Sequence, residues 1–270
     1  MSLVRRIVLS ALTRPDRHRF GPDPSQVADL HLPSGPGPFP VAVVLHGGYW
    51  QTRYGRLVTR PLAADLARRG WAAWNLEYRR LGPGRGGGGG WPMTFDDVAA
   101  GIDHLGELGD PRLDLTRVAA LGHSAGGQLA LWAGARHGLP AGAPGADPLV
   151  TVTRVAALAP VTNLAAAGGV ARALLGGSPE EVPERFAQAD PVRRGPLRVP
   201  VLVVHALDDR TVPAARSREY AAGLRAAGAD LTLVEVPTGG HRSPIDPAWQ
   251  PWEATVAWLG AEQPVAAGVR

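Results

Sequence analysis

Apolar runs and longer amphipathic stretches alternate along most of the chain, and this alternation restricts the possible folds more than any other feature. Seven short apolar runs bounded by Gly or Pro are typical of strands that are buried on both faces. They cover residues 27–32, 41–45, 72–78, 118–122, 152–158, 201–206 and 231–236. Helix-like stretches cover residues 56–69, 95–108, 125–136, 213–227 and 247–259. This order predicts an α/β fold with one mostly parallel, doubly wound sheet and helices on both faces.

The 270 residues contain no internal repeat and no clear linker, so we predict a single domain over residues 1–270. Residues 82–90 (GPGRGGGGG) are too rich in glycine for regular structure. We expect them either to form a mobile loop or to be a tolerant surface insertion. Residues 162–191 are expected to form a small cap segment over the carboxyl edge of the sheet, where open α/β sheets bind ligands.

The composition excludes several kinds of protein. The chain has no Cys, which rules out disulfides, thiolate metal sites and a cysteine nucleophile. Its net charge is +4, and the arginines are spread along the chain, so we expect no nucleic-acid partner. No apolar run is long enough to span a bilayer, and residues 1–15 lack the apolar core and cleavage site of a signal peptide. A cytoplasmic protein without membrane contacts is therefore expected.

The segment RVAALGHSAGGQLALWAG, residues 117–134, contains a G-x-S-x-G motif between an apolar strand and a helical run. Such a motif is typical of a nucleophile elbow, in which the serine occupies a strained strand-to-helix turn. Gly122 and Gly126 leave room for neighbouring backbone around Ser124. The amides at the start of the helix, with its positive dipole end, would face developing negative charge. Ser124 is therefore the candidate nucleophile.

A serine nucleophile of this kind needs a histidine and a carboxylate after it in the sequence. Only His137, His205 and His241 follow Ser124. His205 lies inside an apolar strand, where a structural role is expected. His241 follows the last strand on a glycine-containing turn, which suits a general base, although an exposed loop histidine is the alternative.

Two adjacent aspartates, Asp208 and Asp209, follow the strand 201–206 and are the candidates for the acid. Spacing alone does not separate them. Because neighbouring side chains point in different directions, only one can face His241. The other is expected to cap the turn before the helix that starts at Pro213.

With these motifs, the chain resembles the α/β-hydrolase superfamily over nearly its whole length. More narrowly, it is similar to the branch of kynurenine formamidases (arylformamidases) and of small carboxylesterases related to acetyl-xylan and feruloyl esterases. The motifs that carry the resemblance are HGGYW at 46–50, EYR at 77–79, GHSAGG at 122–127 and HALDDRTVP at 205–213. The branch usually has H-G-x-x-D-x-x-V-P at the last of these, with Ala206 here in place of the glycine. This resemblance implies that Asp209, four residues after His205, is the acid.

The resemblance implies a serine hydrolase that cleaves carboxylic esters or aryl formamides through an acyl-enzyme on Ser124, with no metal or organic cofactor. The expected oxyanion hole comprises the amide of Ala125 and one from the Gly48–Tyr49 turn. The side chains expected to contact the substrate are Tyr49, Trp50, Trp91 and His123. The expected partner is a small-molecule substrate, and the chain is expected to be a monomer or homodimer.

Two other functions are compatible with the same fold. A non-enzymatic binding protein is possible because a fold does not guarantee activity, but such proteins usually lose one of the three catalytic residues. A peptidase-like amide hydrolase usually carries an additional propeller or a large cap, which 270 residues do not accommodate.

Overall fold

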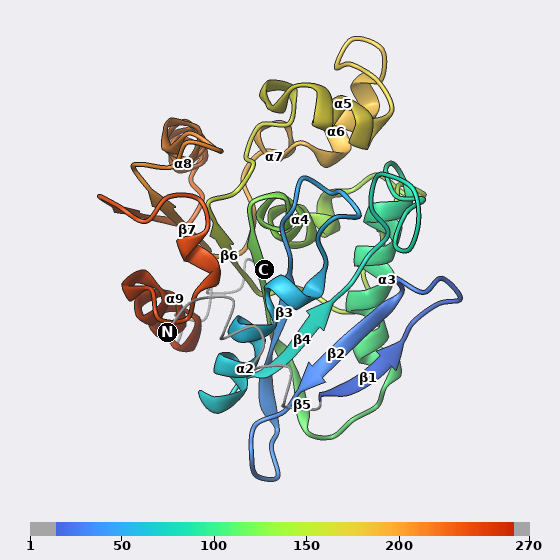
Figure 1. The fold of residues 1–270 in the computed structure, drawn as a ribbon, viewed down its shortest axis with the longest axis vertical. Coiled ribbons are helices and arrows are strands. Elements are labelled where there is room, and N and C mark those ends of the chain that lie inside the picture. The colour runs from blue at the N-terminus through green and yellow to red at the C-terminus, as the bar shows by residue number, and fades with distance from the viewer. Residues whose placement is uncertain (1–14, 262–270) are drawn as a thin grey trace, which may run out of the picture.

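The computed structural model describes residues 15–261 and has one eight-stranded sheet in the order β1-β2-β4-β3-β5-β6-β7-β8 (Figure 1). The strands are β1 (Asp16–Arg19), β2 (Val27–His31), β3 (Phe39–Leu45), β4 (Ala72–Leu76), β5 (Leu113–His123), β6 (Arg154–Leu158), β7 (Val201–Ala206) and β8 (Leu231–Val236). The helices are α2 (Arg60–Arg68), α3 (Met93–Glu107), α4 (Ala125–Gly134), α5 (Gly169–Leu175), α6 (Pro183–Ala189), α7 (Pro191–Arg194), α8 (Ala214–Ala226) and α9 (Gln250–Gly260). The expectations for residues 1–14 and 262–270 lie outside the described residues.

The central strands are buried on both faces, as their continuous apolar runs predict. Along β3, Val41, Val43 and Leu45 pack into one apolar cluster, which also contains residues of α3, α4 and α8. The alternate residues Ala42 and Val44 pack into a second cluster with residues of α2 and α9. Because successive side chains of a strand point to opposite faces, these two clusters are the two layers between sheet and helices.

The prediction of a mostly parallel, doubly wound sheet is confirmed. Strands β4, β3, β5, β6, β7 and β8 are parallel, while β1 pairs antiparallel with β2 and β2 pairs antiparallel with β4. Strand β1 has no apolar pattern by which it could be predicted, because its residues, Asp-Arg-His-Arg, are polar and lie at the edge of the sheet. Instead of an apolar face, an ion pair between Arg17 and Asp29 connects this edge strand to β2.

The segment 162–191 contains α5 and α6, and it continues into α7. Figure 1 shows these helices gathered at the top of the molecule, beyond the carboxyl end of β5, where α4 begins. Buried Asp190 holds the two ends of the segment together, because it accepts a hydrogen bond from the amide of Leu164 at 2.9 Å. The glycine-rich residues 82–90 have no helix, and hydrogen bonds connect them to the backbone of Arg80. Mobility of this loop stays a prediction. None of the helices between residues 15 and 261 has the length and apolar character needed to cross a membrane.

Candidate active site

Ser124 occupies a strained turn between β5 and α4. Its φ and ψ are 55° and −118°, which is outside the regions that a residue with a side chain commonly adopts. A hydrogen bond of 2.9 Å from its amide to the carbonyl of Leu158 on β6 holds the turn in place. Gly126 allows the close packing behind the turn, since a Cβ there would lie 2.2 Å from the carbonyl oxygen of Leu45. The turn therefore has the conformation of a nucleophile elbow.

Gly126→Ala is expected to lower the free energy of unfolding by about 3 kcal/mol or more, because the added methyl group collides with backbone rather than with a flexible side chain. The matched control is Gly223→Ala. Gly223 is an exposed residue inside α8, and a Cβ there meets no atom within 4 Å. That variant should gain about 0.5–1 kcal/mol. Urea unfolding of both variants measures the difference, and equal stabilities would contradict the packing argument.

The structure brings Ser124, His241 and Asp209 together at hydrogen-bond distance. The Nε2 atom of His241 lies 2.9 Å from the Oγ atom of Ser124, and its Nδ1 atom lies 2.7 Å from Oδ2 of Asp209. Asp209 can accept only from a protonated Nδ1, so Nε2 is left free to take the proton of the serine. This geometry matches a Ser–His–Asp triad.

Asp209 is held as a carboxylate. Burial alone would raise its pKa, but hydrogen bonds from His205, His241 and the amides of Thr211 and Val212 outweigh that effect and hold the pKa well below the usual range. Asp209 is therefore ionised near pH 7. His205, expected to be structural, is fully buried and lies between Asp209 at 3.2 Å and the hydroxyl of Ser217 at 2.7 Å.

Asp208 contacts the backbone of the loop that carries His241, whereas Asp209 contacts the imidazole. Its Oδ1 atom accepts a hydrogen bond of 2.7 Å from the amide of Gly240, the residue before His241. The expectation that the second aspartate caps the turn before α8 is wrong. Asp209 itself accepts from the amides of Thr211 and Val212, and Asp208 fixes the loop that carries the base.

His123 lies beside His241. Its Nε2 atom donates to the carbonyl oxygen of His241 at 2.7 Å, and the two rings are 4.7 Å apart. Burial, followed by the proximity of His241, lowers the pKa of His123 to about 3. His123 is therefore neutral near pH 7 and adds no charge next to the base, although it does line the cavity on that side.

The lowered pKa of His123 predicts an acid-dependent loss of stability. Between pH 6.5 and about 3 the unfolded chain binds a proton at this residue that the folded chain does not. The free energy of unfolding therefore falls as the pH falls, by up to about 1.4 kcal/mol per pH unit from this residue. Urea unfolding at several pH values gives the slope of the free energy of unfolding against pH. In His123→Gln this slope should be smaller than in the wild type by the equivalent of about one proton. Exposed His137→Gln is the control, and identical slopes in the two variants would contradict the assignment.

The loop 46–50 is braced from beneath by a buried polar cluster. The imidazole of His46 contacts Oε1 of Glu77 at 2.8 Å and stacks on the ring of Tyr78, with centroids 4.3 Å apart. The hydroxyl of Tyr78 donates to the carbonyl of His46 at 2.7 Å. Glu77 also accepts from the amide of Arg56 at 3.1 Å. These contacts fix the start of the loop without involving His46 in a reaction.

Residues 48–50 all have positive φ, and the loop passes close to Ser124, since a Cβ built at Gly47 would lie 3.1 Å from Cβ of Ser124. The φ angles are 116° at Gly48, 56° at Tyr49 and 54° at Trp50. Gly48 is required here, because a Cβ would lie 2.4 Å from the side chain of Tyr54. Tyr49 lines a cavity together with Ser124 and Ala125. The amide of Ala125 belongs to the first turn of α4, where helical amides lack partners within the helix. These positions suit the predicted oxyanion hole.

Trp50 and Tyr49 have different surroundings. Trp50 is 1% exposed, and its indole N–H donates to Oε1 of Gln128 at 3.2 Å. Gln128 in turn donates to the carbonyl of Ala189 at the end of α6, so one buried amide connects the loop to the cap segment. Tyr49 is 45% exposed and faces the cavity. Trp50 therefore mainly fixes the loop by packing in the interior, although it also lines the cavity. The ring of Tyr49 is the more exposed of the two.

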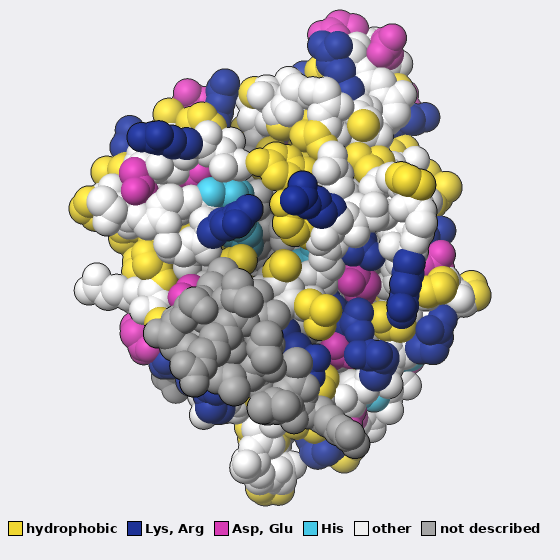
Figure 2. All heavy atoms as spheres, viewed as in Figure 1, with side chains coloured by type: hydrophobic (Ala, Val, Ile, Leu, Met, Phe, Trp, Pro, Cys, Tyr) yellow, Lys and Arg dark blue, Asp and Glu magenta, His cyan; other side chains and the backbone are white. Residues whose placement is uncertain are grey.

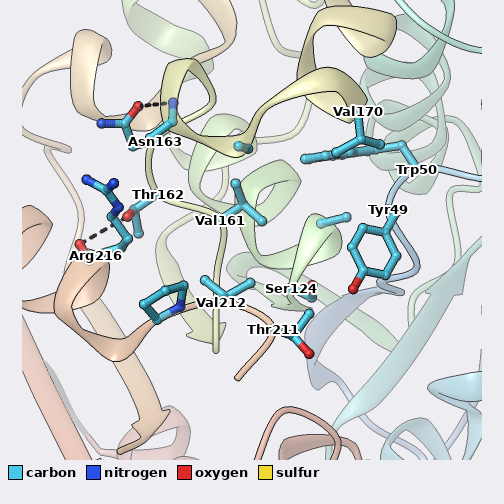
Figure 3. A pocket seen from close by; sticks show the side chains of 14 residues that line it. Tyr49, Trp50, Ser124, Val161, Thr162, Asn163, Val170, Thr211, Val212 and Arg216 are labelled. Atoms are coloured by element: carbon cyan, nitrogen blue, oxygen red, sulfur yellow. Dashed lines mark hydrogen bonds between the residues drawn. The ribbon is translucent and has the colours of Figure 1, made fainter. Parts of the chain in front are cut away.

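Two cavities meet at Ser124 (Figure 3 shows the first). The first, of about 180 Å³, is walled by Val161, the segment 162–170 and the turn before α8. The second has a volume of about 340 Å³, and its lining includes Tyr49, Tyr54, Val58, His241 and Arg242. On the face of the molecule shown in Figure 2, histidine atoms reach the surface between arginine side chains. Ser124 is only 5% exposed, but it lines both cavities.

Trp91 does not reach this site. Its amide donates to the carbonyl of Leu174, and its ring packs on Phe95 with centroids 5.0 Å apart. It lines neither cavity, so the expectation that it contacts the substrate is wrong. Its large apolar ring packs in the contact between α3 and the cap segment instead.

Several residues of the site were missed from the sequence, including Tyr54, Gln128 and Arg216. Gln128 had a usable signal, because it lies four residues after Ser124 and therefore on the same helical face. Tyr54 and Arg216 reach the cavities only through tertiary packing. Within residues 15–261, no cluster of three or more His, Asp or Glu side chains is arranged to hold a metal ion.

The fold, with its elbow at the carboxyl end of β5, is that of the α/β-hydrolases. The BD-FAE family matches residues 28–224, which is well over half of the chain, and the protein belongs to this family. Two curated relatives are esterases of Mycobacterium tuberculosis. LipC is 26% identical over 250 residues, which cover 82% of this chain and 58% of LipC. LipQ is 28% identical over 214 residues, which cover 75% of this chain and 50% of LipQ. The chain thus spans about half the length of these relatives.

Solved structures share the fold at low sequence identity. A truncated carbohydrate esterase from gut microbiota superposes with a TM-score of 0.79 at 20% identity, covering 92% of this chain and 96% of its own. Esterase 2 of Thermogutta terrifontis with bound butyrate has a TM-score of 0.71 at 18% identity, covering 93% and 98%. The same esterase phosphoramylated by tabun has a TM-score of 0.72 at 20% identity, covering 93% and 97%. The likenesses extend over almost the whole of each chain and support the assignment of the fold.

Proposed function

We propose that the protein is a serine carboxylesterase that hydrolyses esters of short carboxylic acids. The observation that carries this proposal is the pair of contacts through His241, at 2.9 Å to Ser124 and 2.7 Å to Asp209, at the meeting point of two cavities. The relatives LipC and LipQ are named esterases, and one structural neighbour is butyrate-bound, which supports the same class.

In the proposed reaction Oγ of Ser124 attacks the ester carbonyl while Nε2 of His241 takes its proton. The amides of Ala125 and Tyr49 hold the oxyanion, and one such donor typically lowers the barrier by about 3 kcal/mol. His241 then gives the proton to the departing alkoxide. Water repeats the sequence on the acyl-enzyme and releases the acid. Asp209 keeps the imidazole in its reactive tautomer throughout.

The position of His241 indicates which cavity would hold the leaving group and which the acyl group. Because the leaving oxygen must receive a proton from His241, the leaving group occupies the cavity that this residue lines, with Tyr49 and Tyr54 beside it. The acyl group then occupies the cavity walled by the cap segment. Its volume of about 180 Å³ is below the roughly 300–1,000 Å³ typical of drug-sized ligands, so short acyl groups are favoured.

Aryl formamides are the second candidate substrate, because two tyrosines line the leaving-group cavity and suit an aromatic amine. The acyl cavity is much larger than a formyl group needs, which favours esters. The test compares 4-nitrophenyl acetate and butyrate with an N-formyl aryl amine. We expect turnover of both esters, and much slower turnover of 4-nitrophenyl decanoate, whose acyl chain is longer. Faster hydrolysis of the formamide would favour the formamidase, and no turnover of any of these substrates would favour a binding protein.

A further inference from the structure

The acyl cavity has an uneven distribution of polar groups. Val161, Val170 and Val212 give it apolar walls, while Thr211 lies next to Ser124 (Figure 3). At the end opposite Tyr49 and Trp50, Figure 3 shows the side chain of Arg216. Of the described residues that line the cavity, only Arg216 carries a charge. An acyl chain that extends from Ser124 along the apolar walls therefore approaches a cation.

The cation is held in position but is only weakly neutralised. Arg216 lies in the first turn of α8, and its backbone carbonyl accepts a hydrogen bond of 3.1 Å from the hydroxyl of Thr162. Its Nη1 atom pairs with Glu219 at 3.1 Å, but the two side chains are 42% and 63% exposed. Pairs this exposed contribute little, so the guanidinium can exchange this partner for a ligand. Glu219 does not line the cavity.

A guanidinium presents N–H donors in a planar fork that matches a carboxylate. No carboxylate among the lining residues competes for it inside the cavity. We propose that the acyl cavity accepts acyl groups that end in a carboxylate, with Arg216 binding that terminal group. The substrates would be monoesters of short dicarboxylic acids. This inference rests on the proposed esterase function and adds the class of acyl group.

The reaction itself is unchanged by the terminal carboxylate. Oγ of Ser124 forms a bond to the ester carbonyl carbon, the bond to the leaving oxygen breaks, and the alkoxide takes the proton from His241. Water then cleaves the acyl-enzyme and yields the free dicarboxylic acid. The distal carboxylate takes no part in bond breaking, so its contact with Arg216 affects binding and orientation of the acyl chain.

The test uses 4-nitrophenyl monoesters of succinic, glutaric and adipic acid, each beside the analogue with a terminal amide. Spontaneous cyclisation is measured without enzyme and subtracted. The quantity compared is the ratio of kcat/KM for the acid-ended ester to that for its amide. We expect a ratio of about five to ten for at least one chain length, the size expected for a partly exposed charged hydrogen bond. The three chain lengths place the terminal carboxylate at three different distances from the ester carbonyl.

Arg216→Gln is expected to reduce that ratio to about one. The matched control is Arg218→Gln, which removes the same charge from the same helix. Arg218 pairs with Glu235 and does not line the cavity, so its variant should keep the wild-type ratio. A wild-type ratio at or below one for all three lengths overturns the inference, and so does an equal loss in both variants. Turnover of 4-nitrophenyl acetate in the same assay keeps this outcome separate from failure of the esterase function.

Discussion

Ser124→Ala is expected to lower kcat for 4-nitrophenyl butyrate by a factor on the order of 10⁴–10⁶. The loss is this large because the variant has no atom that can form the acyl-enzyme, and His241 then has no hydroxyl to activate at 2.9 Å. Residual hydrolysis would come only from water attacking a substrate held by the oxyanion amides. Steady-state kinetics with enzyme concentrations in the micromolar range would detect this residual hydrolysis.

Stability provides the control for this variant. The strained φ of Ser124 is set by the packing of β5 and α4, and alanine carries the same Cβ, so urea unfolding should differ little from the wild type. A folded Ser124→Ala variant that retains more than a few per cent of the wild-type kcat would contradict the assignment of the nucleophile.

Asp209→Asn is expected to lower kcat by about 10⁴-fold. Asparagine can offer an N–H to Nδ1 of His241 in place of a carboxylate, which favours the tautomer whose proton is on Nε2, where it opposes deprotonation of Ser124. The negative charge that stabilises the imidazolium is lost as well. The contacts of Asp209 with the amides of Thr211 and Val212 survive in asparagine, so the turn should stay folded.

The neighbouring Asp208→Asn variant is the matched control, because it makes the same substitution one residue away. Its contact with the amide of Gly240 needs only a carbonyl oxygen, which asparagine retains. We expect a loss of less than about fivefold, which corresponds to about 1 kcal/mol of barrier. If Asp208→Asn were the more damaging variant, the assignment of the acid would be reversed.

Most of the fold could be predicted from the sequence because its strands are buried on both faces. Continuous apolar runs such as the one in β3 leave no alternative to a covered sheet, and the helices between them impose parallel pairing. The polar edge strand β1 has no such pattern, since its stability comes from pairing with β2 and from the ion pair between Arg17 and Asp29. Local sequence does not contain that information.

The candidate site could be predicted where short motifs determine geometry. Ser124 and its two glycines form one turn, and His241 follows the last strand, so both positions follow from local sequence. Asp208 and Asp209 could not be separated by spacing, because the direction of each side chain depends on the turn that Asp209 itself stabilises. Arg216 enters the acyl cavity only through the packing of α8 beside the cap segment, which no local pattern indicates.

The most direct test of the account is to react the protein with diisopropyl fluorophosphate and locate the adduct by peptide mass spectrometry. Oγ of Ser124 should displace fluoride and form a bond to phosphorus while His241 takes the proton. We predict one adduct per chain, on the peptide that contains Ser124, formed much more slowly in His241→Gln. An unlabelled protein, or an adduct on another residue while Ser124 stays unmodified, would contradict the central claim that Ser124 is an activated nucleophile.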